Sequence, residues 1–328
     1  MRRVVFALLT LLMAATCMPR AEAQQAQGSI GIALAEAPTN RANDPRARVY
    51  IVDHVAPGTT ISRKVRVSNN TNETESIDTY AASASIKDGE FRFGDGHARN
   101  ELTTWTTVEP STDSYAPGET KLVTVTIAVP KDASEGERYG VVWASVSSTP
   151  TAGQSITSVN RVGVRIYLSV GPGGEPPSSF RVTGIQARRT DKGQPQVVAR
   201  VENTGGRALD LSGSLRLTNG PGGLSAGPFD VKLGTTLGVG ETEPVLVTLN
   251  KALPAGPWHA RLDLESGLVK EHAAATITFP KSGSGPVVHP EGQAKSDILS
   301  VLVFVALFVG LLALVYGRRL RRSRAAAA

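Results

Sequence analysis

Cysteine is nearly absent from this chain of 328 residues. The one cysteine, Cys17, falls within residues 1–23, which have the basic start, apolar run and small-residue cleavage site typical of a signal peptide. Cleavage after Ala23 leaves a mature chain with no thiol, so disulfides are excluded and each domain depends on its apolar core. Lipoprotein processing at Cys17 is the alternative, although Thr16 stands where that signal requires a small residue.

Charge is absent from one long stretch near the C-terminus. Residues 298–316 are nineteen uncharged positions in a row, and as a helix they span about 28 Å, close to the ~30 Å hydrocarbon core of a bilayer. The tail that follows, residues 317–328, contains five arginines, and such positive charge is held on the cytoplasmic side. The sequence therefore predicts a single-pass protein of the cell membrane with an extracellular N-terminus and a cytoplasmic C-terminus.

The part of the chain between the leader and the predicted span has no excess of positive charge. Three arginines in the leader and five in the tail leave 27 of the 35 Lys and Arg residues outside, against 28 of the 29 Asp and Glu residues. A near-neutral surface gives no electrostatic basis for binding nucleic acid. We therefore expect no nucleic-acid partner.

Helical periodicity is missing between residues 24 and 279. Apolar residues alternate with a period of two, and Gly, Pro, Asn and Asp interrupt the runs, which favours antiparallel strands with one buried face. The clearest alternating runs are 123–129, 162–170, 209–217, 245–249 and 258–264. The expected fold class is all-β, with two tandem Ig-like antiparallel β-sandwich domains.

A sequence repeat supports the division into two domains. A strand that ends in Asn69 is followed by a Gly-Glu-Thr turn at 118–120, and the same pair recurs as Asn203 and the Gly-Glu-Thr turn at 240–242. Asparagine tolerates the turn that follows a strand, and glycine supplies a positive φ. Each copy therefore predicts one sandwich.

An aromatic residue follows a Pro/Gly turn in each copy of the repeat. We expect Trp143 in the first copy and Trp258 in the second to fill the core between two sheets. The predicted organisation is a first domain over 24–171, a Pro/Gly-rich linker over 172–179, a second domain over 180–280 and a flexible stalk over 281–297.

Five segments of the first domain form a recognisable pattern. They are 48–51, the Pro-Gly-Thr turn at 57–59, the Val-x-Val-x-Asn-x-Thr segment at 65–71, 116–120 and 125–130. Together they resemble the DUF916-type N-terminal domain of the WxL-interacting protein family, and the resemblance covers about residues 28–171. It implies that the first domain binds peptidoglycan. The second domain, more loosely similar to the Ig-like domain that follows in that family, is by the same resemblance expected to bind a protein partner.

A catalytic constellation is also missing from the sequence. Residues 223–227 fit G-x-S-x-G, but Gly and Pro on both sides predict a loop instead of the strand–turn–helix that a nucleophile elbow needs. The five histidines include no pair at metal-ligand spacing, and the acidic, Gly-rich stretch 88–96 is better explained by a DG-type turn than by a Ca²⁺ site. We therefore predict no enzyme activity, no metal and no cofactor.

Aromatic residues make up only 5% of the chain, which leaves few side chains that could stack on a sugar. The candidates are Trp105, Tyr80 and Tyr115. We predict a bacterial cell-surface, membrane-anchored, non-catalytic binding or scaffold protein, with peptidoglycan as the ligand of its first domain. Two alternatives stay open: an assembly subunit that pairs with another surface protein by sheet-edge addition, and a secreted-side hydrolase.

Overall fold

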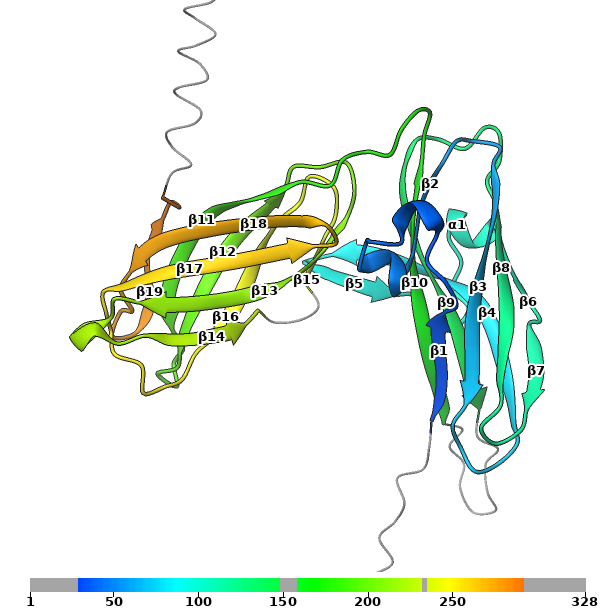
Figure 1. The fold of residues 1–328 in the computed structure, drawn as a ribbon, viewed down its shortest axis with the longest axis horizontal. Coiled ribbons are helices and arrows are strands. Elements are labelled where there is room, and N and C mark those ends of the chain that lie inside the picture. The colour runs from blue at the N-terminus through cyan, green and yellow to red at the C-terminus, as the bar shows by residue number, and fades with distance from the viewer. Residues whose placement is uncertain (1–28, 148–157, 232–234, 292–328) are drawn as a thin grey trace, which may run out of the picture.

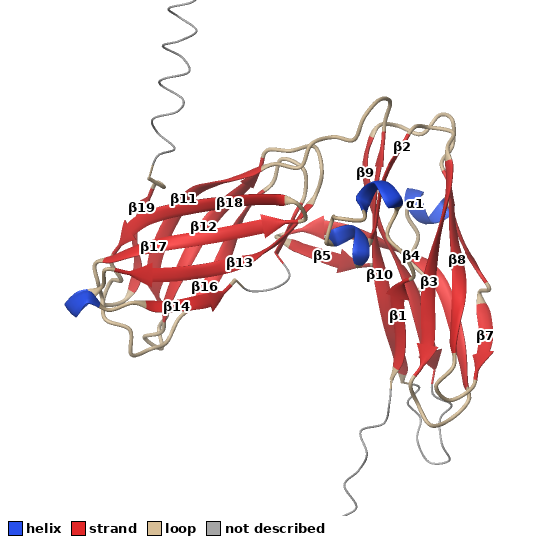
Figure 2. Ribbon diagram, in the orientation of Figure 1, coloured by secondary structure: helices blue, strands red, loops and turns tan. Residues whose placement is uncertain are grey.

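The structure, a computed structural model, describes residues 29–147, 158–231 and 235–291 (Figures 1 and 2). Nearly all regular elements in these residues are strands, which confirms the all-β prediction, and their arrangement in several sheets is consistent with Ig-like β-sandwiches. The remaining described elements are one short helix and three 3-10 turns: α1 (Glu101–Thr104), η1 (Thr39–Arg41), η2 (Arg46–Arg48) and η3 (Pro221–Gly223).

Among the described residues, no helix is long and apolar enough to cross a membrane. The predicted signal peptide (1–23), the predicted span (298–316) and the predicted basic tail (317–328) lie outside the described residues. The orientation in the membrane therefore stays a prediction from the sequence.

Ten strands and α1 build the first sandwich. The strands are β1 (Ile30–Leu34), β2 (Ile51–Val55), β3 (Thr60–Asn69), β4 (Glu75–Lys87), β5 (Glu90–Phe93), β6 (Thr106–Glu109), β7 (Thr112–Tyr115), β8 (Thr120–Ala128), β9 (Gly136–Ser147) and β10 (Val159–Val170). One sheet has the order β1-β3-β8-β6, and the other has the order β2-β10-β9-β4-β5, with β7 also paired to β4. Every pair is antiparallel except β2, which runs parallel to β10.

The two sheets of the first sandwich are joined where the chain crosses between them. Alternate side chains of both sheets meet in one apolar core, which explains the period of two in the sequence. After β1 the chain leaves the first sheet, passes through η1 and η2, and enters the second sheet as β2. As a result, β1 at the edge of one sheet lies beside β10 in the other (Figure 1).

Nine strands build the second sandwich. They are β11 (Phe180–Arg189), β12 (Pro195–Asn203), β13 (Leu209–Thr218), β14 (Ala226–Asp230), β15 (Thr235–Leu237), β16 (Thr242–Thr248), β17 (Trp258–Ser266), β18 (Val269–Ile277) and β19 (Gly283–Val288). The sheets have the orders β16-β12-β11-β19 and β14-β13-β17-β18, with β15 also paired to β13. Trp258 is 1% exposed within this core, as the sequence predicts.

The stretch 281–297 is not the uninterrupted coil that the sequence predicts. Residues 283–288 form β19, which pairs antiparallel with β11. Its glycines and Pro286 suggested a coil, but β19 is an edge strand with a register shift, and both proline and irregular pairing are tolerated at a sheet edge. Residues 292–297 lie outside the described residues.

The two asparagines of the repeat are buried anchors. The Nδ2 of Asn69 donates hydrogen bonds to the carbonyl oxygens of Glu73 and Tyr115 at 2.7 and 2.9 Å. In the second copy, the Nδ2 of Asn203 donates to the carbonyl oxygen of Arg207 at 2.7 Å. Each asparagine therefore ties the end of its strand to separate loops inside the protein.

The Gly-Glu-Thr turn of each copy closes on the same asparagine. The backbone N–H of Asn69 donates to the carbonyl oxygen of Glu119 at 2.9 Å, and the N–H of Asn203 donates to that of Glu241 at 2.9 Å. The two halves of the sequence repeat are thus in direct contact in both sandwiches, which gives the repeat a structural explanation.

Replacing Asn69 with alanine is expected to lower the free energy of unfolding of the first sandwich by about 1–3 kcal/mol, because the carbonyls of Glu73 and Tyr115 lose the Nδ2 donor, which is buried with Tyr115. Urea unfolding of the full chain measures this loss. The matched control is Asn70→Ala at the exposed neighbouring position, which should cost less than about 0.5 kcal/mol. Equal losses from the two substitutions would contradict the anchoring role.

Candidate functional site

The three aromatic residues predicted as ligand contacts lie apart. Contrary to the expectation of exposure, Tyr115 is 0% exposed in the first core, so it offers no face to a ligand. Trp105 follows α1 and is half-buried, with the guanidinium of Arg138 4.9 Å from its ring centroid. Tyr80 lies on β4 and stacks on His97 with 3.7 Å between ring centroids. These three residues do not assemble into a sugar platform, and peptidoglycan binding stays a prediction.

The G-x-S-x-G stretch at 223–227 and the acidic, Gly-rich stretch at 88–96 have simple structural roles. Ser225 of the G-x-S-x-G stretch is exposed in the loop between η3 and β14, as predicted. Asp88 and Gly89, with φ of 54° and 71°, form the tight turn between β4 and β5, which confirms the DG-type turn. In the described part of the chain, no group of three His, Cys, Asp or Glu side chains could hold a metal ion.

One serine–histidine pair lies across the β2–β10 pairing. The Nδ1 of His54 is 3.1 Å from the Oγ of Ser169. Ser169 is buried, and no carboxylate of the described residues contacts His54, so the pair has neither an accessible nucleophile nor an acid to orient the imidazole. The pair is therefore a structural contact.

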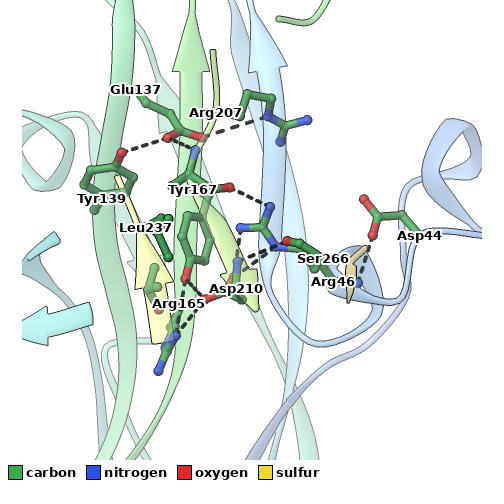
Figure 3. Close-up of polar contacts among 12 residues, drawn as sticks. Asp44, Arg46, Glu137, Tyr139, Arg165, Tyr167, Arg207, Asp210, Leu237 and Ser266 are labelled. Atoms are coloured by element: carbon green, nitrogen blue, oxygen red, sulfur yellow. Dashed lines mark hydrogen bonds and ion pairs between the residues drawn. The ribbon is translucent and has the colours of Figure 1, made fainter. Parts of the chain in front are cut away.

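A cluster of buried charges joins the two sandwiches (Figure 3). Asp210, at the start of β13, accepts hydrogen bonds from Arg46 Nε at 2.9 Å, Arg165 Nη1 at 3.1 Å and the Tyr167 hydroxyl at 2.7 Å. Arg46 Nη2 also lies 2.9 Å from the same carboxylate, and Thr236 Oγ1 donates to it at 3.0 Å. One carboxylate of the second sandwich thus forms ion pairs with two arginines of the first.

A second carboxylate in this cluster points from the first sandwich to the second. Glu137 accepts hydrogen bonds from the Tyr139 hydroxyl and from the backbone N–H of Ala208, both at 2.7 Å. Burial raises the pKa of Glu137, although these two hydrogen bonds act against the shift. Burial, and then the charge of Arg41, lower the pKa of Arg207 to about 10. Glu137 and Arg207 are therefore buried ionisable groups, and each needs its partners at the interface to stay charged there.

The linker between the sandwiches takes part in the same cluster. Glu175, in the Pro/Gly-rich linker, forms ion pairs with Arg41 of the first sandwich and with Arg207 of the second. The N–H of Thr236 in β15 adds a backbone hydrogen bond of 2.9 Å to the carbonyl of Gly89, at the tip of the β4–β5 turn. The carboxylates here face arginine, tyrosine and backbone donors, although Glu137 Oε1 is buried with no hydrogen bond and lies 3.9 Å from Arg207 Nε. These contacts link the two sandwiches.

A backbone edge of the first sandwich is open. β10 pairs with β9 along its whole length, but on its other side β2 pairs only with Ile166–Val170. Within the described residues, no strand pairs with that side of Val159–Arg165, which we call the free edge of β10. Alternate residues of this segment direct unpaired N–H and C=O groups outward.

The edge strands of the second sandwich carry protection that the free edge of β10 does not have. Pro228, Pro244 and Pro286 interrupt β14, β16 and β19, and each removes a backbone donor. β18 presents exposed Lys270 and Glu271. The free edge of β10 contains no proline, lysine or acidic residue, and its charged side chains are Arg161 and Arg165. Such a row of backbone groups is a template on which another strand can pair.

Comparison with known proteins adds distant structural similarity. No protein-family model matches this chain, and no curated protein matches it. The E. coli chaperone DraB is 10% identical, with 76% of this chain and 99% of that chain covered and a TM-score of 0.39. A chain of the Salmonella enterica SafA pilin–SafB chaperone complex is 10% identical, with coverages of 76% and 97% and a TM-score of 0.42. A chain of the CsuC–CsuE chaperone–tip adhesion subunit complex of Acinetobacter baumannii is 12% identical, with coverages of 70% and 96% and a TM-score of 0.36. Likenesses of this size assign neither a family nor a function.

Sequence reasoning missed both the interdomain cluster and the free edge. Arg46 and Asp210 are 164 positions apart, and no local pattern links them. The run from Val162 to Val170 was recognised as a strand, but its sequence does not show which part of it lacks a neighbour. The absence of proline and lysine does not give this information, because the central strands β9, β13 and β17 lack both residues as well.

Proposed function

We propose that this protein is a non-catalytic cell-surface binding protein that pairs with another surface protein by accepting one of its strands at the free edge of β10. The observation that carries the proposal is a seven-residue strand segment, Val159–Arg165, whose edge contains no proline and pairs with no strand of the described residues. Main-chain hydrogen bonds at such an edge supply affinity, and pockets for alternate side chains supply specificity.

The side chains around the free edge support this proposal. The neighbouring β1 ends the opposite sheet and lies beside β10, and we call the boundary between these two strands the seam. Ile32 and Val162 are half-buried at this seam, and Val159 is 57% exposed. A strand with apolar side chains on its inward face would cover Ile32 and Val162 and extend the core, which is the driving force for such an addition.

The predicted leader and span complete the proposal. With residues 1–23 as a signal peptide and 298–316 as a membrane anchor, both sandwiches are outside the membrane, where they meet other surface proteins. The interdomain cluster then acts as a brace that holds the first sandwich, and its free edge, at a fixed angle to the second.

Selection of strand-forming peptides tests the proposed function. Nine-residue peptides selected from a random library on the full-length chain are expected to alternate apolar and polar residues and to protect backbone amides within Val159–Arg165 from hydrogen exchange. Val162→Lys places an inward-pointing charge at this edge, a device by which natural edge strands avoid pairing, and is expected to reduce peptide binding at least tenfold.

The matched control is Thr276→Lys, which adds the same charge at an exposed position of β18. This variant should bind the selected peptides like the unmodified chain. Circular dichroism and melting temperature show whether both variants are folded. Peptides without alternation, protection outside the free edge, or equal binding by the two variants would each contradict strand addition at β10.

A further inference from the structure

We propose that Arg161 selects the incoming strand by binding an acidic side chain on its outward face. The inference rests on the proposed function, since it concerns the chemistry of the strand that pairs with the free edge of β10. The expected partner is a strand in which aliphatic residues alternate with acidic ones.

A glycine and a tryptophan hold Arg161 in position. Gly163 lies directly opposite Trp143 in the β9–β10 pair. A Cβ at Gly163 would lie 2.6 Å from Trp143 Cε3, so the absence of a side chain lets the indole ring lie across β10. The guanidinium of Arg161 then stacks on this ring, 4.5 Å from its centroid. A stacked arginine keeps its N–H donors in the guanidinium plane, where a carboxylate can bind them at the edge.

The charge of Arg161 has no partner in the described residues. The other arginine on the outward face of the free edge, Arg165, is bound to Asp210 of the second sandwich. Ser145 is the residue opposite Arg161 on β9, and Asp78 is the residue opposite Ser145 on β4. Asp78 is therefore two strands away from Arg161, and its carboxylate accepts a hydrogen bond from Thr112. Arg161 is thus a preoriented cation beside an open backbone edge.

The alternation of β10 determines which positions of the partner strand meet this cation. Side chains of Val162 and Val164 point toward the core, whereas Arg161, Gly163 and Arg165 lie on the outward face. A paired strand obeys the same alternation, so its inward residues contact the apolar seam. Its outward residues lie opposite or diagonal to Arg161, within reach of a carboxylate side chain. Lysine or arginine at those positions would place like charges side by side.

Three synthetic peptides test the proposal directly. Each is nine residues long and alternates valine with glutamate, glutamine or lysine, and each is labelled and titrated with the full-length chain by fluorescence polarisation. The glutamate peptide is expected to bind about threefold to fivefold more tightly than the glutamine peptide, the size of one partly exposed ion pair, and the lysine peptide more weakly than both. The preference should decrease as salt is added, because screening weakens exposed pairs.

Substitutions at Arg161 distinguish this proposal from the proposed function. Arg161→Gln is expected to remove the difference between the glutamate and glutamine peptides, and Arg161→Glu to reverse the order in favour of lysine; both variants are checked for unchanged circular dichroism. If all three peptides bind equally and Arg161→Glu changes nothing, selection by Arg161 is wrong while strand addition stands. If none of the peptides binds and none protects Val159–Arg165 from exchange, the proposed function fails and this inference with it.

Discussion

Replacing Trp258 with alanine is expected to lower the free energy of unfolding of the second sandwich by about 3–5 kcal/mol. The side chain is 1% exposed and lies at the start of β17, within the core cluster. Its Nε1 donates a hydrogen bond of 3.1 Å to the carbonyl of Pro254. Alanine would leave a cavity of most of an indole and an unpaired carbonyl. A loss of this size is a large share of the 5–15 kcal/mol that typically stabilises a domain.

The surroundings of Trp258 allow little relaxation into such a cavity. A Cβ at Gly220 would lie 2.2 Å from the ring, and a Cβ at Gly256 would lie 2.8 Å from it, so the indole is packed directly against the backbone of two loops. Backbone hydrogen bonds hold both loops, from the Gly220 N–H to the Leu224 carbonyl at 2.9 Å and from the Phe279 N–H to the Ala255 carbonyl at 2.7 Å, which limits their collapse into the cavity. Urea unfolding of the full chain, followed by circular dichroism, measures the loss.

Two further substitutions control this experiment. Trp258→Phe keeps most of the apolar volume but loses the hydrogen bond to Pro254, and it should cost less than Trp258→Ala. Leu268→Ala removes an apolar side chain that is exposed at the β17–β18 turn and should cost less than about 0.5 kcal/mol. An unchanged unfolding midpoint for Trp258→Ala would rule out its role in the core.

The features of the fold that the sequence predicts are those encoded by neighbouring residues. Alternation in the run 162–170 identifies β10, and the Gly-Glu-Thr repeat identifies two copies of one architecture. Trp258 could be placed in the core because it leads an alternating strand whose other inward residues are leucine and alanine. These signals depend on a side-chain period that tertiary contacts do not alter.

The faces and edges of strands are harder to predict, because they depend on partners distant in the sequence. Trp143 is buried as predicted, but on the outward face of its sheet, where Gly163, Phe93 and Arg161 cover it. Tyr115, a candidate for an exposed aromatic, lies on β7, which pairs with β4, and its ring is in the core with Lys121 over it. In both cases the covering residues come from other strands.

The asparagines of the repeat show how a correct pattern can be given an incomplete physical reason. The sequence predicts Asn69 and Asn203 as residues that tolerate a turn. In the structure, each is buried and donates from its side chain to loop carbonyls. The sequence shows that the two copies share this residue, but the acceptors are backbone groups, which every residue has, so the contact cannot be derived from residue types.

Replacing Asp210 with alanine is expected to release the two sandwiches from each other. The carboxylate pairs with Arg46, whose side chain is 8% exposed, and also with Arg165, so its removal leaves two adjacent cations without the anion that they share. Breaking a buried ion pair by removing one partner typically costs about 3–5 kcal/mol. Here the arginines can regain water if the sandwiches separate, so the loss should appear mainly as opening of the interface.

Hydrogen exchange at two interdomain amides measures this opening. The N–H of Ala208 donates to Glu137, and the N–H of Thr236 donates to the carbonyl of Gly89, so both are protected only while the sandwiches are docked. Asp210→Ala is expected to increase their exchange rates by a hundredfold or more, which corresponds to about 3 kcal/mol of opening free energy. Amides within β3 and β8, which pair inside the first sandwich, should keep their protection.

Charge and hydrogen bonding at Asp210 can be separated with matched variants. Asp210→Asn keeps an acceptor for the Tyr167 and Thr236 hydroxyls but removes the charge, so it should give an intermediate increase in exchange. Asp263→Ala removes a carboxylate that is paired with Arg261 on the exposed face of the same sandwich, and should leave both interdomain amides unchanged. If Asp210→Ala leaves the exchange of Ala208 and Thr236 at its original rate, the charge cluster does not hold the sandwiches together and the proposed brace is wrong.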